Sequence, residues 1–364
     1  MNILVIGDPH FKKNNIPQVN DFIKTIMSFI STLSPLNFIV VEGDLLHTHE
    51  HLHSDVLNKA VEFVKRLSSF CPVYILVGNH DAINNSIFLT TSHWMNCLKS
   101  FPNITVVDDV LVKQEFAFCP YVPNGRFQEA LFTKLSLEDL KKITCIFAHQ
   151  ELSGAKMGSI ISTAEKWNDD FPLVVSGHIH DKHWAQPNIF YTGSIMQHAF
   201  GDSSDKTILL LEITDKKGNK ERENKEEKIV KSNNKTCIFH EIDLSLAKKF
   251  LFHFNISDFD EKQVQKLLER KQHGSSLSEY KIYLAGDEDD FKCFQKTHIY
   301  KLLCSQKMKI VFKHPRKELE TIQKNMKNML NMKKSSFSET LSHIIEDGEE
   351  KEELKKLFEK LRKS

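Results

Sequence analysis

The chain has 364 residues, 40% hydrophobic and 27% charged, so it can bury a large core without disulfides or metal staples. Its 49 Lys and Arg balance its 48 Asp and Glu, which excludes a uniformly basic nucleic-acid clamp and leaves a local patch or bridging metal ions. Its 7 Cys include no C-x-x-C pair, which favours a reducing, intracellular compartment over a disulfide framework. No apolar run is long enough to predict a membrane span.

The first part of the chain alternates apolar runs typical of buried strands with segments of helical spacing. In chain order, these predict a strand over 3–6, a helix over 19–33, a strand over 38–41, a helix over 55–70, a strand over 73–77, a helix over 86–98, a strand after Phe101, strands over 143–148, 173–176 and 189–191, and a hairpin over 206–213. This order predicts an α/β layered domain over residues 1–214.

Three further segments follow this domain. Residues 215–235 are charge-rich and predict a solvated loop or linker. Residues 236–315 predict a smaller α/β unit, with strands over 251–256, 280–284 and 309–312 and a helix over 261–270. Residues 316–364 predict Lys/Glu-rich helices over 316–332 and 338–361. An apolar stripe on the second of these must be buried, either on its own domain or on a partner helix; it includes Leu354, Leu357, Phe358 and Leu361.

Five short polar motifs each follow a predicted strand. They are Asp8-Pro9-His10, Gly43-Asp44-Leu45-Leu46-His47, Gly78-Asn79-His80-Asp81, His149, and Gly177-His178-Ile179-His180. Sheets of this class collect functional side chains at the carboxyl ends of their strands. Bringing these groups together would be costly unless cations satisfied them. Carboxylate, amide and imidazole ligands suit Mn²⁺, and also Fe²⁺ or Zn²⁺, better than Ca²⁺.

The motifs, in this order, resemble those of the calcineurin-like metallophosphoesterases, and most of all the Mre11/SbcD DNA-repair nucleases and their phage and viral relatives. The resemblance covers the first domain motif by motif and the remainder only in layout. It implies an α/β fold with a four-layer α/β/β/α sandwich, a small capping domain over 236–315 and a C-terminal helical tail. It also implies two metal ions, Mn²⁺ first among them. One would be held by Asp8, His10 and His180, the other by Asn79, His149 and His178, with Asp44 as the bridge.

The resemblance implies catalytic roles for three more residues. His80 would contact the scissile phosphate and assist the leaving group, His47 would stabilise the phosphate, and Asp81 would orient His80 or a ligand. The alternatives are that His80 merely braces its loop and that His47 caps a helix or faces solvent. The nearby His49, His51 and His53 are typical of a solvated loop before a helix, for which Ser54 is a candidate N-cap.

The resulting prediction is a Mn²⁺-dependent DNA nuclease, with exonuclease and endonuclease activity, in which hydroxide activated by two metals attacks the phosphodiester. The implied partners are DNA, a Rad50/SbcC-like coiled-coil ATPase bound by the C-terminal helices, and a second copy bound through 55–70 and 86–98, in a repair or recombination complex. The lysine-rich stretch 281–316 either contacts phosphates or is an ordinary mixed surface. Two alternatives are a stand-alone enzyme for small phosphodiesters or phosphoproteins and a non-catalytic scaffold. The Asn/Lys/Ile-rich composition suggests an A+T-rich genome, such as a viral one.

Overall fold

The computed structural model describes residues 1–49, 51–215 and 228–313. The chain divides into two compact units. The first contains Met1–Phe250 with Glu269–Glu279, and the second contains Leu251–Leu268 and, of the described residues, those from Tyr280 to Lys313. Within the described ranges, every helix falls short of the length and apolar character that crossing a bilayer requires.

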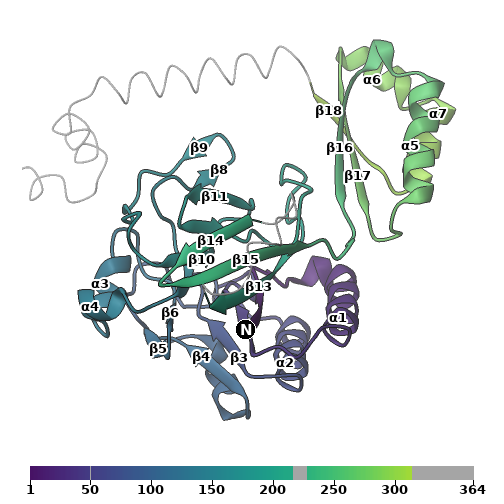
Figure 1. The fold of residues 1–364 in the computed structure, drawn as a ribbon. Helices are drawn as coiled ribbons and strands as arrows, with labels where there is room; N and C mark the ends of the chain where they lie inside the picture. Colours follow the sequence, from purple (N-terminus) through teal and green to yellow (C-terminus); the bar gives the residue numbers. More distant parts are fainter. Residues whose placement is uncertain (50, 216–227, 314–364) are drawn as a thin grey trace, which may run out of the picture. The chain divides into compact units, whose positions relative to one another are not determined.

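The first unit contains a seven-stranded sheet ordered β14-β15-β13-β1-β2-β3-β4 (Figure 1). Its strands are β1 (Asn2–Ile6), β2 (Phe38–Val41), β3 (Val73–Leu76), β4 (Ile104–Val107), β13 (Ile208–Asp215), β14 (Lys228–Ser232) and β15 (Lys235–Ile242). Strands β1 to β4 run parallel, whereas β13, β15 and β14 join in antiparallel order on the other side of β1.

A six-stranded sheet, ordered β11-β12-β10-β7-β6-β5, is the second layer of strands. Its members are β5 (Leu111–Lys113), β6 (Phe116–Cys119), β7 (Cys145–His149), β10 (Leu173–Gly177), β11 (His183–Gln186) and β12 (Ile189–Tyr191). The four inner strands run parallel. A separate two-stranded hairpin, β8 (Lys156–Met157) with β9 (Ile160–Ile161), follows β7.

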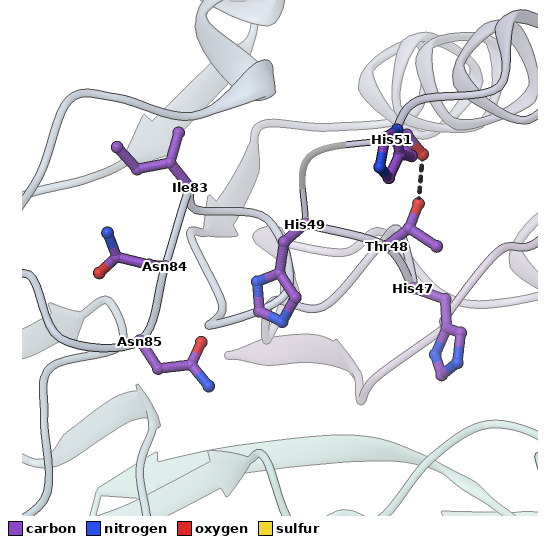
Figure 2. Close-up of a pocket in the computed structure, with 7 residues that line it drawn as sticks. All are labelled: His47, Thr48, His49, His51, Ile83, Asn84 and Asn85. Carbon is purple, nitrogen blue, oxygen red and sulfur yellow. Dashed lines mark hydrogen bonds between the residues drawn. The ribbon is translucent and has the colours of Figure 1, made fainter. Parts of the chain in front are cut away.

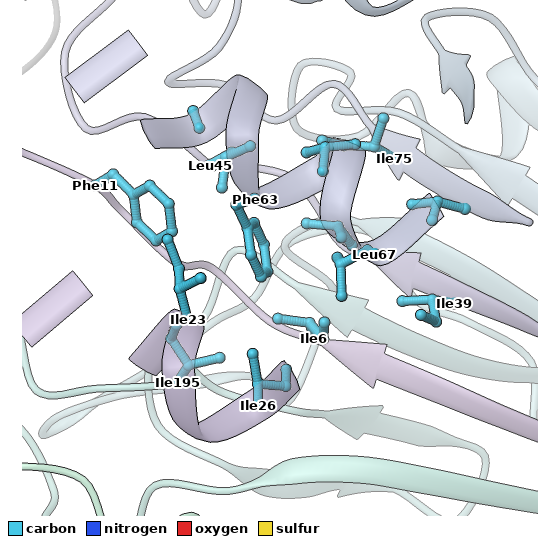
Figure 3. Close-up of a cluster of buried hydrophobic side chains, with 14 of the residues drawn as sticks. Ile6, Phe11, Ile23, Ile26, Ile39, Leu45, Phe63, Leu67, Ile75 and Ile195 are labelled. Atoms are coloured by element: carbon cyan, nitrogen blue, oxygen red, sulfur yellow. The ribbon is translucent and has the colours of Figure 1, made fainter. Parts of the chain in front are cut away.

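Alternation along the strands sorts the buried side chains into three apolar clusters, since neighbouring residues of a strand face opposite sides of its sheet. In β1, Ile3 and Val5 join residues of the second sheet in a cluster between the sheets, while Leu4 and Ile6 face the helices (Figure 3). The outer face of the first sheet is covered by α1 (Ile16–Ile30), α2 (Ser54–Ser68) and the 3-10 helix Trp94–Ser100, and that of the second by α3 (Phe127–Phe132) and α4 (Leu137–Leu140). This confirms the predicted α/β/β/α sandwich.

Helices α1 and α2 form because their apolar residues recur at helical spacing. In α1 the buried residues are Val19, Phe22, Ile23, Ile26, Met27 and Ile30, and in α2 they are Val56, Ala60, Phe63, Val64 and Leu67. Both stripes face the first sheet. A one-turn 3-10 helix, Lys13–Asn15, precedes α1 and joins it to the loop after β1.

The second unit is built around a three-stranded sheet ordered β16-β17-β18. The elements around this sheet are β16 (Lys249–Asn255), the 3-10 helix Ile256–Asp258, α5 (Glu261–His273), β17 (Glu279–Ala285), α6 (Glu288–Phe294), α7 (His298–Ser305) and β18 (Lys309–Lys313). The end of α5, from Glu269, belongs to the first unit. Buried residues alternate along β17 with partly exposed ones, so one face of this sheet carries the core. The capping role of this unit stays a prediction.

Three sequence predictions differ from the structure. The expected linker over 215–235 is partly strand, because β14 and the start of β15 complete the seven-stranded sheet, and the first unit extends to Phe250. The expected hairpin over 206–213 is one strand, β13, whose antiparallel partners are β1 and β15. The expected helix over 86–98 is a loop followed by the 3-10 helix Trp94–Ser100. The predicted helices over 316–332 and 338–361 lie outside the described residues.

Candidate active site

The structure brings the seven predicted metal ligands together at the carboxyl ends of five strands. Asp8 and His10 follow β1, Asp44 follows β2, Asn79 follows β3, His149 ends β7, and His178 and His180 follow β10. Strands of both sheets contribute, so packing the two sheets against each other is what assembles the site.

Four of the seven have a positive φ, a region that non-glycine residues rarely adopt. The angles are 30° at Asp8, 44° at His10, 48° at Asp44 and 76° at His178. The loops are held in place by one another. The His10 amide donates to the Asp44 carbonyl at 2.9 Å, and the His178 amide donates to Asp8 Oδ1 at 3.1 Å. Strained backbone gathered at one place is a mark of a functional site.

A first group of ligand atoms comprises His10, His180 and Asp44. His10 Nε2 lies 3.0 Å from His180 Nε2 and 3.5 Å from Asp44 Oδ2. Two ring nitrogens that face each other so closely cannot both carry protons, so at least one presents a lone pair. Burial lowers the pKa of His10 well below its usual value, although Asp44 opposes this. A neutral imidazole is the form that binds metals.

A second group comprises Asn79, His149 and His178. Asn79 Oδ1 lies 3.0 Å from His149 Nε2 and 2.9 Å from His178 Nδ1, and these two nitrogens are 3.3 Å apart. His149 Nδ1 donates to the Glu42 carbonyl at 2.7 Å, which leaves Nε2 as the nitrogen that faces the group. Burial lowers the pKa of His178 to about 3, with His149 adding to the effect.

Asp44 lies between the two groups and is almost fully buried. Its Oδ2 is 3.5 Å from His10 Nε2 and 3.4 Å from His149 Nε2. Burial would raise its pKa, but His149 and His10 outweigh this and hold the pKa well below its usual value. Conversely, burial would lower the pKa of His149, but Asp44 and Asp8 raise it to about 9. Asp44 is therefore an ionised carboxylate within reach of both groups.

The geometry of these residues and the chemistry of their donor atoms both fit divalent cations. Asp8 Oδ2 is buried and accepts no hydrogen bond, so it needs another positive partner. The ligand atoms of Asp44, His149 and His178 lie within 4.8 Å of one another. A Cβ at Gly78 would collide with the Asp44 carboxylate, so glycine is required to leave that carboxylate in place. Carboxylate, amide and imidazole donors together suit transition metals.

His80 lies beside the ligands and faces a pocket of about 450 Å³. Asp44, Asn79 and His178 line the same pocket. The His80 amide donates to Asp44 Oδ1 at 2.8 Å, and its Nδ1 donates to the His47 carbonyl at 2.8 Å. Nδ1 thus carries a proton, which leaves Nε2 to exchange one with a substrate. Burial lowers the pKa of His80, and Asp44 opposes this.

His47 is partly buried against the same ligands. Its ring lies parallel to that of His80, with centroids 5.4 Å apart, and its Nδ1 is 3.3 Å from His10 Nδ1. Ring nitrogens of His10, His47 and His80 also lie within 4.8 Å of one another, a grouping that the sequence did not predict. His47 does not cap α2, which begins only at Ser54.

Asp81, predicted to orient His80 or a ligand, contacts the backbone of the loops that carry Asp44 and Asn79. Its buried carboxylate accepts hydrogen bonds from the Leu46 amide at 3.3 Å, the Gly78 amide at 3.1 Å and Trp94 Nε1 at 2.9 Å. Burial raises its pKa to about 7, with Asp44 adding to the effect. Asp81 braces the loop after Asp44 and so acts on that ligand through the backbone.

His198 was not predicted, yet it lies in the site. Its ring centroid is 4.8 Å from that of His10 and 5.2 Å from that of His180, and its Nε2 is 3.4 Å from the Asp8 carbonyl oxygen. Asp202 holds this segment by accepting from the His198 amide at 2.7 Å. No motif spacing marks His198, since a turn after β12 brings it back to the site.

His49 is the second unpredicted member. It stacks on His80 with centroids 4.6 Å apart. It also lines a second pocket, of about 610 Å³, whose wall is drawn in Figure 2: His47, Thr48, His49, His51, Ile83, Asn84 and Asn85. His51 and His53 are exposed, in line with the predicted solvated loop. The predicted N-cap, Ser54, is instead the first residue of α2, and His53 occupies the cap position.

A model of the calcineurin-like phosphoesterases matches residues 1–182, which is half of the chain. The chain therefore belongs to the calcineurin-like phosphoesterase family and is a metallophosphoesterase, a hydrolase of a class that binds divalent metals. It is 40% identical over 319 residues to "Putative phosphoesterase 078R" of Invertebrate iridescent virus 3, covering 86% of this chain and 84% of that protein.

Two further proteins are similar. "Putative phosphoesterase 244L" of Invertebrate iridescent virus 6 is 50% identical over 218 residues, which cover 58% of this chain and 76% of that protein. Among solved structures, the nuclease MPE of Pseudomonas putida matches 57% of this chain and 84% of its own, with 14% identity and a TM-score of 0.29.

Proposed function

We propose that this metallophosphoesterase is a Mn²⁺-dependent DNA nuclease that cleaves phosphodiester bonds. The observation that carries the proposal is that two groups of cation ligands share Asp44 beside His80 in one open pocket. Two divalent cations, when bound, supply Lewis-acid activation of water and of the phosphate. Imidazole, carboxylate and amide donors are compatible with Mn²⁺.

The protein's own residues supply position and proton control. Asp44 and Asn79 present oxygen atoms to the second group, while the Glu42 carbonyl fixes the orientation of His149. His80 is fixed through Nδ1 by the His47 carbonyl, so that its Nε2 can give a proton to the leaving oxygen. The negative charge of a bound phosphate favours the protonated form of His80 and offsets the effect of burial on its pKa.

A basic and aromatic surface in the second unit supports DNA as the substrate. Lys281 and Tyr283 lie on the partly exposed face of β17. The Nζ atoms of Lys281 and Lys313 lie 4.6 and 4.4 Å from the centre of the Tyr283 ring, and the His253 ring is 5.1 Å from it. Lysines around a partly exposed aromatic ring can contact phosphates while the ring stacks on a base.

The proposed assembly is a repair or recombination complex of the Mre11-Rad50/SbcCD kind, formed inside the cell by a virus-encoded subunit. The apolar stripe within 338–361 would dock on the coiled-coil base of a Rad50/SbcC-like ATPase. A second copy of the chain would pack through α2, whose outer surface carries charged residues. The viral relatives support the viral origin.

The test is a cleavage assay on linear duplexes with defined ends and on circular single-stranded DNA, with Mn²⁺, with Mg²⁺ and with EDTA. We expect Mn²⁺-dependent cleavage of both substrates by the wild-type protein and none by H80N. Methyl p-nitrophenyl phosphate, a minimal diester, serves as a parallel substrate. Hydrolysis of that diester without any cleavage of DNA would contradict the nuclease proposal and favour an enzyme for small phosphodiesters.

A further inference from the structure

The β8–β9 hairpin exposes an unusual amount of apolar surface. Ile160 is 62% exposed and Ile161 is 63% exposed, more than any other large hydrophobic residue in the part of the chain that the structure describes. Met157, in the opposing strand, is 39% exposed. Exposed large apolar side chains that gather in one place commonly mark a binding surface.

The base of this hairpin is firmly held, although its tip is exposed. The Lys156 amide donates to His183 Nε2 at 2.9 Å, and the Ser162 amide donates to the Ala155 carbonyl at 2.8 Å. Ser162 Oγ donates to Glu151 Oε1 at 2.5 Å. These hydrogen bonds fix the base of the hairpin, so its apolar tip loses little conformational entropy when it binds a ligand.

The hairpin also forms part of the wall of the candidate active site. Lys156, Met157 and Gly158 line the 450 Å³ pocket together with Asp44, Asn79, His80, His178 and His180. Met157 is paired directly with Ile160 across the two strands. Because paired residues of antiparallel strands point to the same face, Ile160 extends the apolar edge that Met157 gives to the pocket.

We propose that Met157 and Ile160 form a nucleobase subsite, which contacts the base next to the scissile phosphate. This rests on the proposed function, since it assumes that the phosphate of a nucleotide ester sits in the pocket. A nucleoside joined to that phosphate must leave the pocket past its rim, where Met157 and Ile160 offer apolar surface and Lys156 offers a positive charge. Apolar side chains make such contacts by stacking on an unpaired base or wedging between base steps.

Continuity with the pocket favours a nucleobase over a protein partner for this surface. A protein would have to cover the mouth of the active site in order to reach Met157, whereas a nucleotide substrate meets it while binding. The subsite would therefore separate nucleotide esters from small diesters of the same reactivity. It is a specificity device, because neither side chain can transfer a proton or offers an oxygen or nitrogen ligand to a divalent cation.

The test compares the wild-type protein with the double variant M157Q/I160S on two esters that share a leaving group. One is methyl p-nitrophenyl phosphate and the other is the p-nitrophenyl ester of thymidine 5′-phosphate. We expect kcat/KM for the thymidine ester to fall about tenfold, the scale of one lost apolar contact. The value for the methyl ester should stay unchanged. L137S is the matched control, because Leu137 is 57% exposed on α4 and is not among the described residues that line the pocket.

Two outcomes would overturn the subsite. Equal losses of kcat/KM on both esters would show that the hairpin only supports the site. Unchanged kcat/KM on both esters would show that it does not contact the base and would favour a protein partner for this surface. The fluorescence of a 2-aminopurine-containing single-stranded oligonucleotide gives a readout that needs no cleavage. If the wild-type protein cleaves neither ester, the proposed function fails, yet a smaller change of that fluorescence on adding M157Q/I160S than on adding L137S would still support the subsite.

Discussion

Asp44 has the most exacting position of any residue in the site. Its carboxylate is shared by two groups of imidazoles, accepts the His80 amide, and is held at a φ of 48°. The Asp81 carboxylate accepts a hydrogen bond from the Leu46 amide in the same loop as Asp44. Gly78 packs so closely against Asp44 that any side chain at Gly78 would collide with its carboxylate. Several parts of the chain thus specify the place of one carboxylate.

The first prediction is that D44A loses both metal ions. A bridging carboxylate serves both sites through its two oxygens, so its removal weakens each of them at once. The measurement is the metal content of the purified protein by mass spectrometry after dialysis against Mn²⁺. D108A, which removes a carboxylate from the salt bridge with Lys99, is the control and should retain the wild-type content. Two bound Mn²⁺ ions in D44A would show that Asp44 is not the bridge.

The second prediction concerns H80N. We expect its phosphodiesterase rate to fall by about 10²–10⁴, the usual contribution of a positioned acid or base. Its metal content should equal that of the wild-type protein, because the His80 ring is fixed by the His47 carbonyl beside the metal groups. A rate equal to that of the wild-type protein would mean that His80 only braces its loop.

At the residue scale, the sequence predicted a set of proposed ligands that the structure brings together, but it did not predict which side chains lie beside them. Asp8 and Asp44 each follow an apolar run, and the ends of parallel strands meet at one edge of the first sheet. His149 ends an apolar run in the second sheet and joins them through the packing of the two sheets. His49 and His198 lie in loops that return to the site through tertiary packing. No period or spacing encodes such a return, so both were missed.

At the scale of elements, helix α2 supports the candidate active site by packing against Phe11, the residue that follows His10. Its Phe63 is fully buried, with its ring centre 5.6 Å from that of Phe11 and 5.4 Å from that of Phe22. Phe11 directly follows His10 in the sequence and lies beside Phe63 in the buried cluster (Figure 3). The position of a ligand and the packing of a helix are therefore linked through adjacent residues.

The third prediction is that F63A lowers the free energy of unfolding by about 3–5 kcal/mol, the usual cost of removing a buried phenyl ring. Urea denaturation followed by circular dichroism measures it. F70A is the control, since Phe70 lies just past the same helix and is 44% exposed, so its effect should stay within about 0.5 kcal/mol. Similar losses in the two variants would contradict the packing described for α2.

Strands that are buried on both faces, and helices with one regular apolar stripe, could be predicted from the sequence. An edge strand and an irregular segment could not. Strands β2 and β12 have the predicted bounds because their short runs are wholly apolar. Strand β14 was taken for linker because it carries lysines, which suit the edge of a sheet and hide its strand character. The segment 86–93 was wrongly predicted as helix, since its Ser and Thr residues favour turns over helix.

At the scale of the whole molecule, the ligands, His80 and His47 all belong to the first unit. The chemistry should therefore be separable from any contact made by the end of the chain. Residues 338–361 carry the apolar stripe proposed for docking, and the ligand positions all lie before residue 181.

The fourth prediction is that L357E/F358E, in the full-length chain, abolishes binding to the cognate coiled-coil ATPase and any ATP-stimulated processing of duplex DNA. Burying one such apolar side chain is worth roughly 1.5–3 kcal/mol, so two charges in its place prevent docking. Hydrolysis of methyl p-nitrophenyl phosphate should remain at the wild-type rate. Pull-down and thermal unfolding measure the two effects, and a lower melting temperature of the variant alone would mean that the stripe packs on its own domain.

The strand order of the first sheet dictates when the chain can fold during its synthesis. Strand β1 leaves the ribosome long before β13, yet it lies between β2 and β13, and Leu4 pairs with Leu210. At about 5–20 residues per second, some 10–40 seconds separate the synthesis of these two residues. Until then, one edge of a strand that is apolar from Ile3 to Ile6 has no partner and can pair with other chains. A recombinant fragment cut at residue 182, where the family match ends, would keep this edge open permanently and should aggregate.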